Sequence, residues 1–309
     1  MKDFLLTVVI PVYHEENNIH PLLERVVPII EKYNYEIIFV NDGSKDRTVE
    51  KIKEAGAKNK RVKLVSFNRN FGHQMALIAG YRFAKGDCVV TIDADLQDPP
   101  EIIPEMVEKW QKGASIVYAQ RRKRDVDDFF KKKTAEYFYR FMNFLSDSHI
   151  PENVGDYRLL DRKVVEFLKN LPEHSPFLRG LVAWTGFPEE YVYFIREKRH
   201  TGTTHYSIPK MINFALDGIT SFSAYPLRMA SYMGFTAATI GFIGMIYAIL
   251  GKYWLNVPWV TGWTGLFVGI MFIGGVQLIT IGIIGEYIGK IYIEILNRPH
   301  YLVKETVNI

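Results

Sequence analysis

The stretch Cys88-Val-Val-Thr-Ile-Asp-Ala-Asp-Leu-Gln-Asp-Pro-Pro100 joins a short apolar run to a cluster of acidic residues. The run Cys88–Asp93 is apolar and β-branched without alternation, which predicts a strand buried on both faces of a sheet. Asp93 and Asp95 stand where this strand ends, ahead of a proline pair. Because ligands of an open parallel sheet bind beyond the carboxyl ends of its strands, the stretch indicates both a fold and a site.

Similar apolar runs precede and follow this stretch, and helical patterns separate the first four. In residues 19–30, for example, apolar side chains recur along one helical face. This alternation predicts an α/β fold with a Rossmann-like, doubly wound, mostly parallel sheet. The expected strands are Phe4–Tyr13, Tyr35–Asn41, Val62–Phe67, Cys88–Asp93 and Ser115–Ala119, and the expected helices are Ile19–Ile30, Asp46–Ala57 and His73–Ala84.

Past residue 120 the pattern becomes helical, with helices predicted over Asp127–Leu145, near Asp161–Asn170 and over Ile208–Phe222. The third is amphipathic, so it is predicted either to lie in a membrane interface or to pack on the sheet. Ser44 or Asp46 is the expected N-cap of the helix over 46–57.

Residues 229–285 carry a single charged side chain, Lys252. The uncharged runs on its two sides are each long enough for a membrane span, which needs about 20 apolar residues. The sequence therefore predicts a transmembrane hairpin with helices near 230–250 and 264–285. A pair of buried core helices is the alternative, although such helices usually carry more polar residues.

The chain is thus expected to have four parts. Basic residues flank the hairpin on both sides, which predicts a multi-pass protein of the plasma (inner) membrane with both termini in the cytoplasm. The spacing of Gly265 and Gly269, and of Gly285 and Gly289, predicts a homo-oligomer formed through these helices. The parts are a catalytic domain over 1–204, an amphipathic juxtamembrane segment over 205–228, two transmembrane helices within 229–288 and a cytoplasmic tail over 289–309.

Composition excludes several classes of protein. The net charge of +4 over 309 residues is too small to indicate nucleic acid, and the aromatic residues form no stacking platform, so no nucleic-acid partner is expected. A single cysteine, Cys88, excludes a disulfide framework and is predicted to be a buried hydrophobic residue. No glycine-rich dinucleotide motif or P-loop is present.

The acidic residues after the apolar run suit a divalent cation. Asp93 and Asp95 are two residues apart, so their side chains can point the same way in an extended loop, and Gln97 adds an amide oxygen. Two carboxylates together with substrate phosphates are typical ligands of Mg²⁺ or Mn²⁺. The alternative is that these residues only form a turn. Asp42 and Glu15 at the ends of neighbouring strands favour the metal site.

Three motifs carry a resemblance to a known family. PVYHEENN at 11–18, VNDGSKDRT at 40–48 and DADLQDPP at 93–100 resemble the GT-A fold of family 2 glycosyltransferases. With its two expected spans, the chain resembles polyisoprenyl-phosphate glycosyltransferases over about residues 4–300. It looks closest to the bacterial GtrB-type bactoprenol glucosyltransferases and is related to dolichol-phosphate mannose synthase.

The resemblance implies roles for individual residues. Asp42 would accept a hydrogen bond from the imide of the base, and Glu15 one from a ribose hydroxyl. Arg121 and Arg199 would bind phosphates, for which a planar guanidinium is suited. The implied nucleotide-sugar site is Pro11, Tyr13, Glu15, Asp42 and Asp93, and the implied metal ligands are Asp93, Asp95 and Gln97.

Asp156 occupies the position of the family's second acidic element. A general base is expected for a hydroxyl acceptor, whereas a polyprenyl phosphate is already charged, so Asp156 is predicted either to act as a base or to position other groups. Its alternative role is to cap a helix over 157–170. His73 is predicted to cap the helix that it begins, and a metal-binding or catalytic role is the alternative.

The basic residues Arg121–Arg124 and Lys131–Lys133 form either a solvated surface or a site for lipid headgroups and the acceptor phosphate. The expected acceptor-phosphate ligands are Arg121, Lys131, Lys132, Lys133 and Arg199. The expected catalytic residues are Asp95, Asp156, Arg121 and Arg199.

Together these features predict an inverting, metal-dependent hexosyltransferase. Its expected donor is UDP-glucose and its expected acceptor is undecaprenyl or another polyprenyl phosphate. The alternatives are a polyprenyl-phosphate mannose synthase that uses GDP-mannose, and a non-catalytic lipid-binding scaffold with a transferase fold. A processive polysaccharide synthase is disfavoured because no QxxRW motif is present.

Overall fold

The computed structural model describes residues 4–122, 151, 154–173, 176–195, 225–253 and 262–309. The chain divides into two compact units. One comprises Met1–Asn213 together with Arg298–Ile309, and the other comprises Phe214–Asn297.

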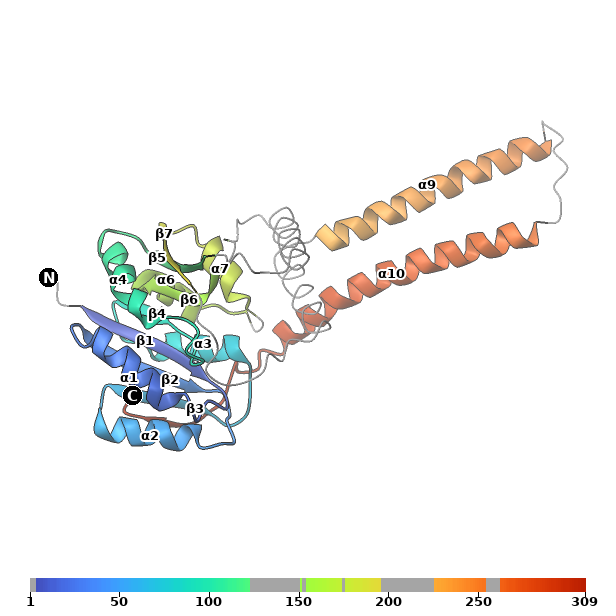
Figure 1. Ribbon diagram of the computed structural model, residues 1–309. Helices are drawn as coiled ribbons and strands as arrows, with labels where there is room; N and C mark the ends of the chain where they lie inside the picture. The colour runs from blue at the N-terminus through green and yellow to red at the C-terminus, as the bar shows by residue number, and fades with distance from the viewer. Residues whose placement is uncertain (1–3, 123–150, 152–153, 174–175, 196–224, 254–261) are drawn as a thin grey trace. The chain divides into compact units, whose positions relative to one another are not determined.

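The first unit is built on an eight-stranded sheet in the order β7-β5-β6-β4-β1-β2-β3-β8 (Figure 1). β6 and β8 run antiparallel to their neighbours and all other pairs are parallel, which confirms the prediction of a mostly parallel α/β sheet. The strands are β1 (Leu5–Val12), β2 (Asn34–Asn41), β3 (Val62–Phe67), β4 (Cys88–Thr91), β5 (Ile116–Arg121), β6 (Val154–Asp161), β7 (Glu189–Phe194) and β8 (Val303–Val307).

Helices cover both faces of this sheet. The apolar faces of α1 (Ile19–Ile30), α2 (Thr48–Lys58) and α4 (Ile103–Gln111) share one buried core with alternate residues of β1 and β2. On the other face, α3 (His73–Phe83) packs closely on β1, because a methyl group on Gly80 would lie 2.2 Å from Val9 Cγ1. α6 (Arg162–Lys169) packs beside α3, and α7 (Leu178–Trp184) packs against α6.

Two capping predictions are resolved by the structure. The helix expected near 161–170 is α6, and its N-cap is Asp161, whose carboxylate accepts from Lys163 N at 2.9 Å. The alternative that Asp156 caps this helix is therefore wrong, because Asp156 lies within β6. The N-cap of α2 is Arg47, so the prediction of Ser44 or Asp46 as N-cap is wrong, although Asp46 still accepts from the Thr48 amide at 3.2 Å and from its hydroxyl at 2.6 Å. The helices predicted over 127–145 and 208–222 lie outside the described residues.

The C-terminal residues differ from the expectation of a separate tail over 289–309. Val303–Val307 forms β8, which pairs with β3 at the edge of the eight-stranded sheet. The chain is held on both sides of this strand: Asn68 N donates to Leu302 O at 3.2 Å, and Asn308 Nδ2 donates to Gly56 O and Val62 O at 2.9 Å. Residues 289–295 continue the helix α10 (Trp263–Ile295) and residues 303–307 complete the sheet, so the bounds predicted for the tail are wrong, while its cytoplasmic location stays a prediction.

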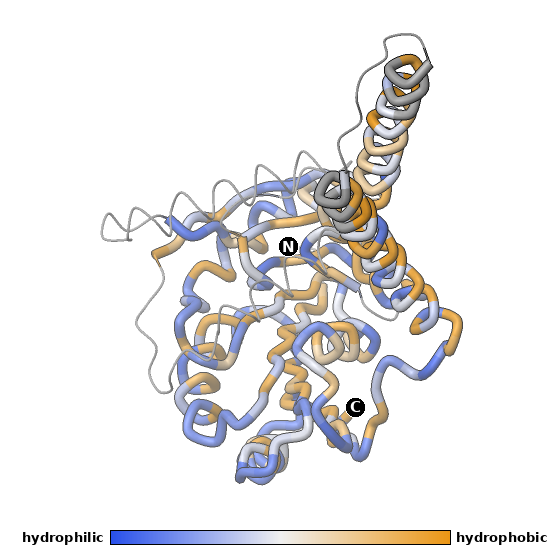
Figure 2. The backbone as a smooth tube through the Cα atoms, turned by 90° about the vertical axis from the view of Figure 1, so that its right-hand side faces the viewer, coloured by the Kyte–Doolittle hydropathy of each residue, from blue (hydrophilic) through white to orange (hydrophobic). Residues whose placement is uncertain are grey.

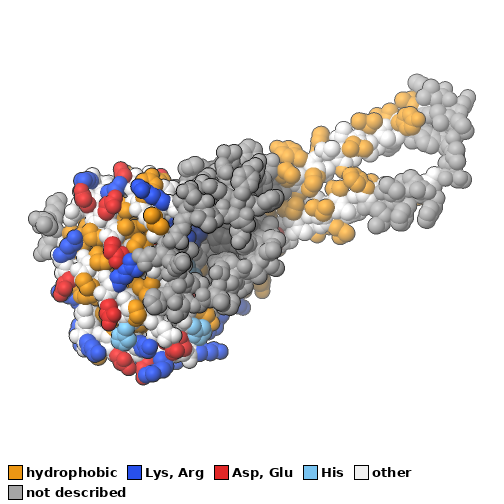
Figure 3. All heavy atoms as spheres, viewed as in Figure 1, with side chains coloured by type: hydrophobic (Ala, Val, Ile, Leu, Met, Phe, Trp, Pro, Cys, Tyr) orange, Lys and Arg blue, Asp and Glu red, His pale blue; other side chains and the backbone are white. Residues whose placement is uncertain are grey.

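The second unit contains α9 (Tyr225–Tyr253) and α10 (Trp263–Ile295), which contact each other. The described residues of both helices are mainly hydrophobic or intermediate in hydropathy (Figure 2), and Figure 3 shows hydrophobic and uncharged side chains along them, whereas Lys, Arg, Asp and Glu are scattered over the first unit. Within the described residues, one segment, Phe272–Ile295 of α10, is long and apolar enough to cross a membrane. A two-helix transmembrane hairpin stays a prediction, as does the homo-oligomer.

Candidate functional site

The loops that follow β1 and β2 are tied together. His14 N donates to Ser44 Oγ at 3.0 Å, and Glu15 N donates to Thr48 Oγ1 at 2.9 Å. His14 has a φ of +58°, which is uncommon for a residue with a side chain and marks a backbone that its surroundings hold in place. Tyr13 remains exposed on this loop, while Pro11 is buried within β1.

Asp42 organises the loop between β3 and α3. Its carboxylate oxygens accept from Phe71 N at 2.6 Å and from Gly72 N at 2.9 Å, and its side chain is buried. Burial raises the pKa of Asp42, although the two amide hydrogen bonds act in the opposite direction. Gly43 has a φ of +73°, and a methyl group there would lie 2.4 Å from the Arg69 carbonyl carbon, so only glycine fits. Contact between Asp42 and a nucleotide base stays a prediction.

The loop between β3 and α3 leads into His73, whose side chain lies close to two acidic residues. α3 begins at His73, and its N-cap is Gly72, so the side chain of His73 does not cap the helix. Instead, His73 Nε2 lies 3.4 Å from Asp156 Oδ2 and 3.8 Å from Asp93 Oδ1. The histidine therefore joins the residue after β4 to a residue inside β6.

Asp156 is a buried carboxylate surrounded by cations. Arg179 of α7 donates from Nη2 to Oδ2 at 2.8 Å and from Nε to Oδ1 at 3.3 Å, and Arg158 Nη2 lies 3.5 Å from Oδ1. Burial alone would raise the pKa of Asp156. The two arginines and the hydrogen bond with His73 outweigh burial and hold the pKa well below its usual range. Asp156 is therefore an anion at neutral pH.

His73 shows the complementary shift. Burial would lower the pKa of His73, but the hydrogen bond with Asp156 and the charges of Asp93 and Asp156 outweigh this effect and raise it. The cluster thus favours a protonated histidine between two carboxylates.

The residues expected to bind a metal lie directly beside this cluster. Burial and the nearby charges of Asp156 and Asp95 raise the pKa of Asp93, against the opposing charge of His73. The Asp95–Gln97 turn is closed by Gln97 N donating to Asp95 Oδ1 at 3.1 Å, across Leu96 with a φ of +59°. Crowded carboxylates of this kind are stabilised by a divalent cation.

The described part of the chain contains no group of three or more His, Cys, Asp and Glu side chains placed to hold a metal. Two carboxylates and an amide oxygen are donors that suit Mg²⁺ or Mn²⁺ when substrate phosphates and water complete the ligands, so metal binding by Asp93, Asp95 and Gln97 stays a prediction.

The other expected phosphate ligands are only partly described. Arg121, at the end of β5, has Nη2 3.8 Å from Asp98 Oδ1 and 3.3 Å from the position of a methyl group on Gly155. Arg121 is therefore close to β6, one residue before Asp156. Lys131, Lys132, Lys133 and Arg199 lie outside the described residues.

With this geometry defined, comparison with known proteins places the chain. Residues 7–168 match the family described as Glycosyl transferase family 2. The chain belongs to this family. It is therefore a glycosyltransferase, as the three acidic motifs predict.

Full-length relatives of this family 2 glycosyltransferase include both uncharacterised and named proteins. An uncharacterized glycosyltransferase, YkcC, of Bacillus subtilis is 46% identical over 98% of this chain and 94% of its own length. A prophage-derived bactoprenol glucosyl transferase of Shigella flexneri is 45% identical over 97% of this chain and 98% of its own length.

Among solved structures, glucosyl-3-phosphoglycerate synthase from Mycobacterium tuberculosis, in complex with Mn²⁺, UDP-glucose and phosphoglyceric acid, is 17% identical. The match covers 70% of this chain and 78% of the synthase chain, with a TM-score of 0.49. This similarity is too low to assign corresponding site residues.

Sequence patterns do not predict two arginines of this glycosyltransferase site, Arg179 and Arg158. Arg179 lies in the apolar run Leu178–Trp184, and nothing in that pattern separates it from a surface residue. Arg158 is two residues from Asp156, so in an extended strand both side chains lie on one face. This spacing was the only signal for Arg158.

Proposed function

We propose that this glycosyltransferase moves glucose from UDP-glucose to the phosphate of an undecaprenyl-type polyprenyl phosphate, with inversion at the anomeric carbon. The observation that carries the proposal is the placement of Asp156, which is buried, pairs with Arg179 through both oxygens and lies near Arg158 and His73. These cationic neighbours lower the pKa of the carboxyl, so Asp156 is a poor proton acceptor. A phosphate monoester, whose second pKa is about 6, needs no base because it is already an anionic nucleophile.

The names of the relatives support the identity of the substrates. Bactoprenol glucosyl transferases match this chain at 45% identity over nearly their whole length, including the residues of α9 and α10. The same relatives favour a polyprenyl acceptor over a soluble one, and glucose over mannose.

The proposed reaction balances without a covalent enzyme intermediate. An oxygen of the acceptor phosphate attacks the anomeric carbon, the bond from that carbon to the diphosphate breaks, and the electron pair leaves with UDP. Mg²⁺ or Mn²⁺, held by Asp93, Asp95 and Gln97, would supply Lewis-acid neutralisation of the diphosphate. Arg179, positioned by Asp156, lies close to the same carboxylates and would hold phosphate charge.

We assign the remaining phosphate contacts to four basic positions and Arg121. Arg199 and Lys131–Lys133 are proposed to bind the acceptor phosphate together with Arg121, because cationic donors in a water-excluded site stabilise a developing phosphate charge. The nucleotide-sugar ligands are proposed to be Pro11, Tyr13, Glu15, Asp42 and Asp93.

The division of the chain supports a membrane hairpin with both ends on one side. Arg298–Ile309 folds into the same unit as Met1–Asn213, so the segment between them must leave that unit and return to it. Such a segment crosses a membrane an even number of times. We propose two crossings, by α9 and α10, with the catalytic domain and both termini in the cytoplasm.

A donor panel tests the proposed activity. The full-length protein in detergent is incubated with undecaprenyl phosphate, a divalent cation and each of several nucleotide sugars, and release of UDP or GDP is measured. We expect UDP release from UDP-glucose that requires the lipid and the metal. Asp95→Ala should abolish transfer, since that carboxylate holds the metal, whereas Glu31→Ala, an exposed acid after α1, should leave it unchanged.

Other results reject specific parts of the proposal. Release of GDP from GDP-mannose in place of UDP would identify a mannose synthase. Binding of nucleotide without turnover in the presence of lipid would identify a scaffold. Metal-dependent turnover by Asp95→Ala would remove the assigned site.

A further inference from the structure

The loop of residues 68–72, between β3 and α3, gains little from burial in the core. Its first three residues are exposed. Its last two are held by hydrogen bonds, because Phe71 N and Gly72 N both donate to the Asp42 carboxylate. α3 begins at the next residue, His73. Any contact that fixes this loop therefore also fixes the start of α3.

Three aromatic rings, here called the aromatic row, connect the C-terminal segment to this loop. Tyr301 stacks on Phe67, with ring centroids 4.7 Å apart and an interplanar angle of 19°. Phe67 in turn packs edge to face against Phe71, with centroids 5.7 Å apart and an angle of 86°. Both arrangements are those in which aromatic rings attract each other. The aromatic row thus runs from a residue shortly after α10 to the residue whose amide holds Asp42.

The middle ring of the aromatic row depends on its two neighbours. Phe67 is buried at the end of β3, whereas Phe71 and Tyr301 are half-buried. Because protein interiors are close-packed, removing one ring frees space for the ring that it touches. Loss of the Tyr301 ring would therefore loosen Phe67 and, through it, Phe71.

Tyr301 also contacts the helix that follows the loop. The guanidinium of Arg82, in the last turn of α3, lies 5.6 Å from the centre of the Tyr301 ring. Arg82 is itself placed by α6, since its Nε donates to Lys169 O at 3.2 Å. Tyr301 therefore joins the strand before the loop, through Phe67, to the helix after it.

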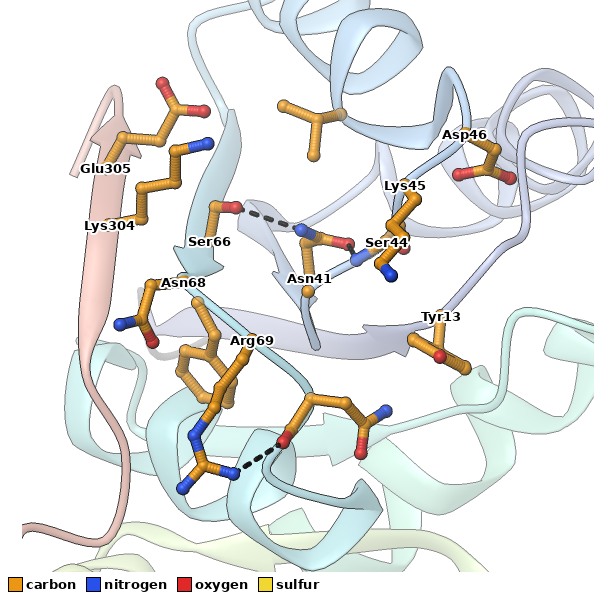
Figure 4. Close-up of a pocket in the computed structure, with 14 residues that line it drawn as sticks. Tyr13, Asn41, Ser44, Lys45, Asp46, Ser66, Asn68, Arg69, Lys304 and Glu305 are labelled. Atoms are coloured by element: carbon orange, nitrogen blue, oxygen red, sulfur yellow. Dashed lines mark hydrogen bonds between the residues drawn. The ribbon is translucent and has the colours of Figure 1, made fainter.

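The rest of the returning chain lies against the same loop. Asn68 N donates to Leu302 O at 3.2 Å. Asn68 and Arg69 line a polar cleft together with Lys304 of β8 (Figure 4). The loop also approaches the turn after β2 closely, because a methyl group on Gly43 would lie 2.4 Å from the Arg69 carbonyl carbon. The loop is thus in contact with both the turn after β2 and the segment after α10.

We propose that Tyr301 is a positioning residue for glycosyl transfer. It acts through Phe67 and Phe71 on the loop between β3 and α3. That loop leads into His73, whose Nε2 lies 3.4 Å from Asp156 Oδ2 in the acidic cluster. The inference rests on the glycosyl transfer that the family performs, and not on the proposed donor or acceptor.

Hydrogen–deuterium exchange of the full-length protein in detergent tests the aromatic row without any substrate. Tyr301→Leu removes the ring and keeps an apolar side chain. The Phe71 and Gly72 amides should then exchange about three- to tenfold faster, the equivalent of one lost aromatic pair. Tyr301→Phe retains the ring and should exchange like wild type.

Asn308→Gly is the matched control, because it weakens the attachment of β8 without changing a ring. It removes the hydrogen bonds to Gly56 O and Val62 O, and glycine accepts the φ of +58° at this position. We expect kcat/KM for the nucleotide sugar that wild type uses to fall about three- to tenfold in Tyr301→Leu. It should stay within about twofold of wild type in Tyr301→Phe and Asn308→Gly.

The exchange measurement separates this inference from the proposed function. Faster exchange in Tyr301→Leu that Tyr301→Phe restores supports the role of the aromatic row even if wild type transfers no glucose. Unchanged exchange at Phe71 and Gly72 would overturn the inference. So would a loss of kcat/KM in Asn308→Gly as large as that in Tyr301→Leu, because attachment of β8 alone would then explain the effect.

Discussion

Asp156 combines three features that are rarely found in one carboxylate: burial within a strand, contacts with two arginines and proximity to a histidine. Removing one partner of such a group leaves the other charges buried and unpaired, so the group acts through the positions of its neighbours. We therefore treat Asp156 as a positioning residue for Arg179 and His73.

Asp156→Asn separates positioning from general-base catalysis. The amide cannot hold Arg179 in the same bidentate pair, so kcat should fall about 10²-fold, the effect of a misplaced catalytic group. The residual activity should still decrease below about pH 6, because this limb reports ionisation of the acceptor phosphate. The pH–rate profiles of wild type and the variant are compared to check this expectation.

A matched control shows whether the loss of activity in Asp156→Asn comes from a general loss of folding. Asp161→Asn, five residues further along β6, retains a side chain that can cap α6 and should be close to wild type in kcat. If the acid limb disappears in Asp156→Asn while Asp161→Asn is normal, Asp156 is the base and the positioning role is wrong.

Sequence patterns locate the acidic residues of the site because strand ends in a parallel sheet meet at one edge. Asp93 and Asp156 are indeed brought to one histidine. The patterns cannot reveal Arg179, since it lies in an ordinary surface-like context and reaches Asp156 only through tertiary packing. The left-handed backbone at His14 and Leu96 is likewise invisible in the sequence.

At the scale of elements, Glu36 of β2 joins three strands. Its carboxylate accepts from Thr7 Oγ1 of β1 at 2.6 Å, from Lys63 Nζ of β3 at 2.6 Å and from the Lys85 amide at 2.8 Å. Burial would raise the pKa of Glu36, but these donors outweigh burial and lower it. The network links β1, β2 and β3 near the amino end of β2.

The stability supplied by Glu36 should depend on pH. Because its folded pKa is lowered, the contribution is present above the unfolded pKa of about 4.3 and is lost as pH falls through the folded value. Glu36→Gln should cost about 2 kcal/mol at pH 7, and the difference from wild type should shrink below about pH 4. Thermal unfolding of the full-length protein in detergent measures both values.

The comparison needs a control for the general effect of removing one charge. Glu24→Gln, on the exposed side of α1, should leave the unfolding midpoint unchanged at both pH values. A loss of stability in Glu36→Gln that is the same at pH 7 and pH 3.5 would show that folding does not lower the pKa of Glu36.

The elements that were predicted correctly share one property. β1 to β5 are continuous apolar runs, and burial on both faces gives such runs a clear signal. β6 was missed because Asp156 and Arg158 interrupt its apolar run, and their charges are tolerated only because they pair within the sheet. β7 and β8 were not predicted because these edge strands carry charged residues, and such a pattern is also typical of loops.

At the scale of the whole molecule, the single cysteine makes the proposed topology measurable. Cys88 is fully buried and burial raises the pKa of its thiol, so it should not react with a maleimide. In intact cells, a membrane-impermeant maleimide should label Asn256→Cys, between the two helices, but not Lys60→Cys on the first unit. Lys60→Cys should react after the membrane is permeabilised.

The wild-type chain, with Cys88 alone, is the control for background labelling. Labelling of both introduced cysteines from the same side would mean that the hairpin does not cross the membrane. Labelling of Lys60→Cys alone in intact cells would place the catalytic domain outside.

The position of β8 after α9 and α10 in the chain also determines when the sheet can be completed during synthesis. A ribosome synthesises β3 long before β8, and both helices are made between them, so the edge of β3 stays unpaired while the hairpin is inserted. An exposed strand edge is a site for aggregation. In the proposed membrane topology, closure of the sheet by Val303–Val307 would follow insertion of both helices, so completion of the glycosyltransferase fold would depend on arrival of the chain in the bilayer.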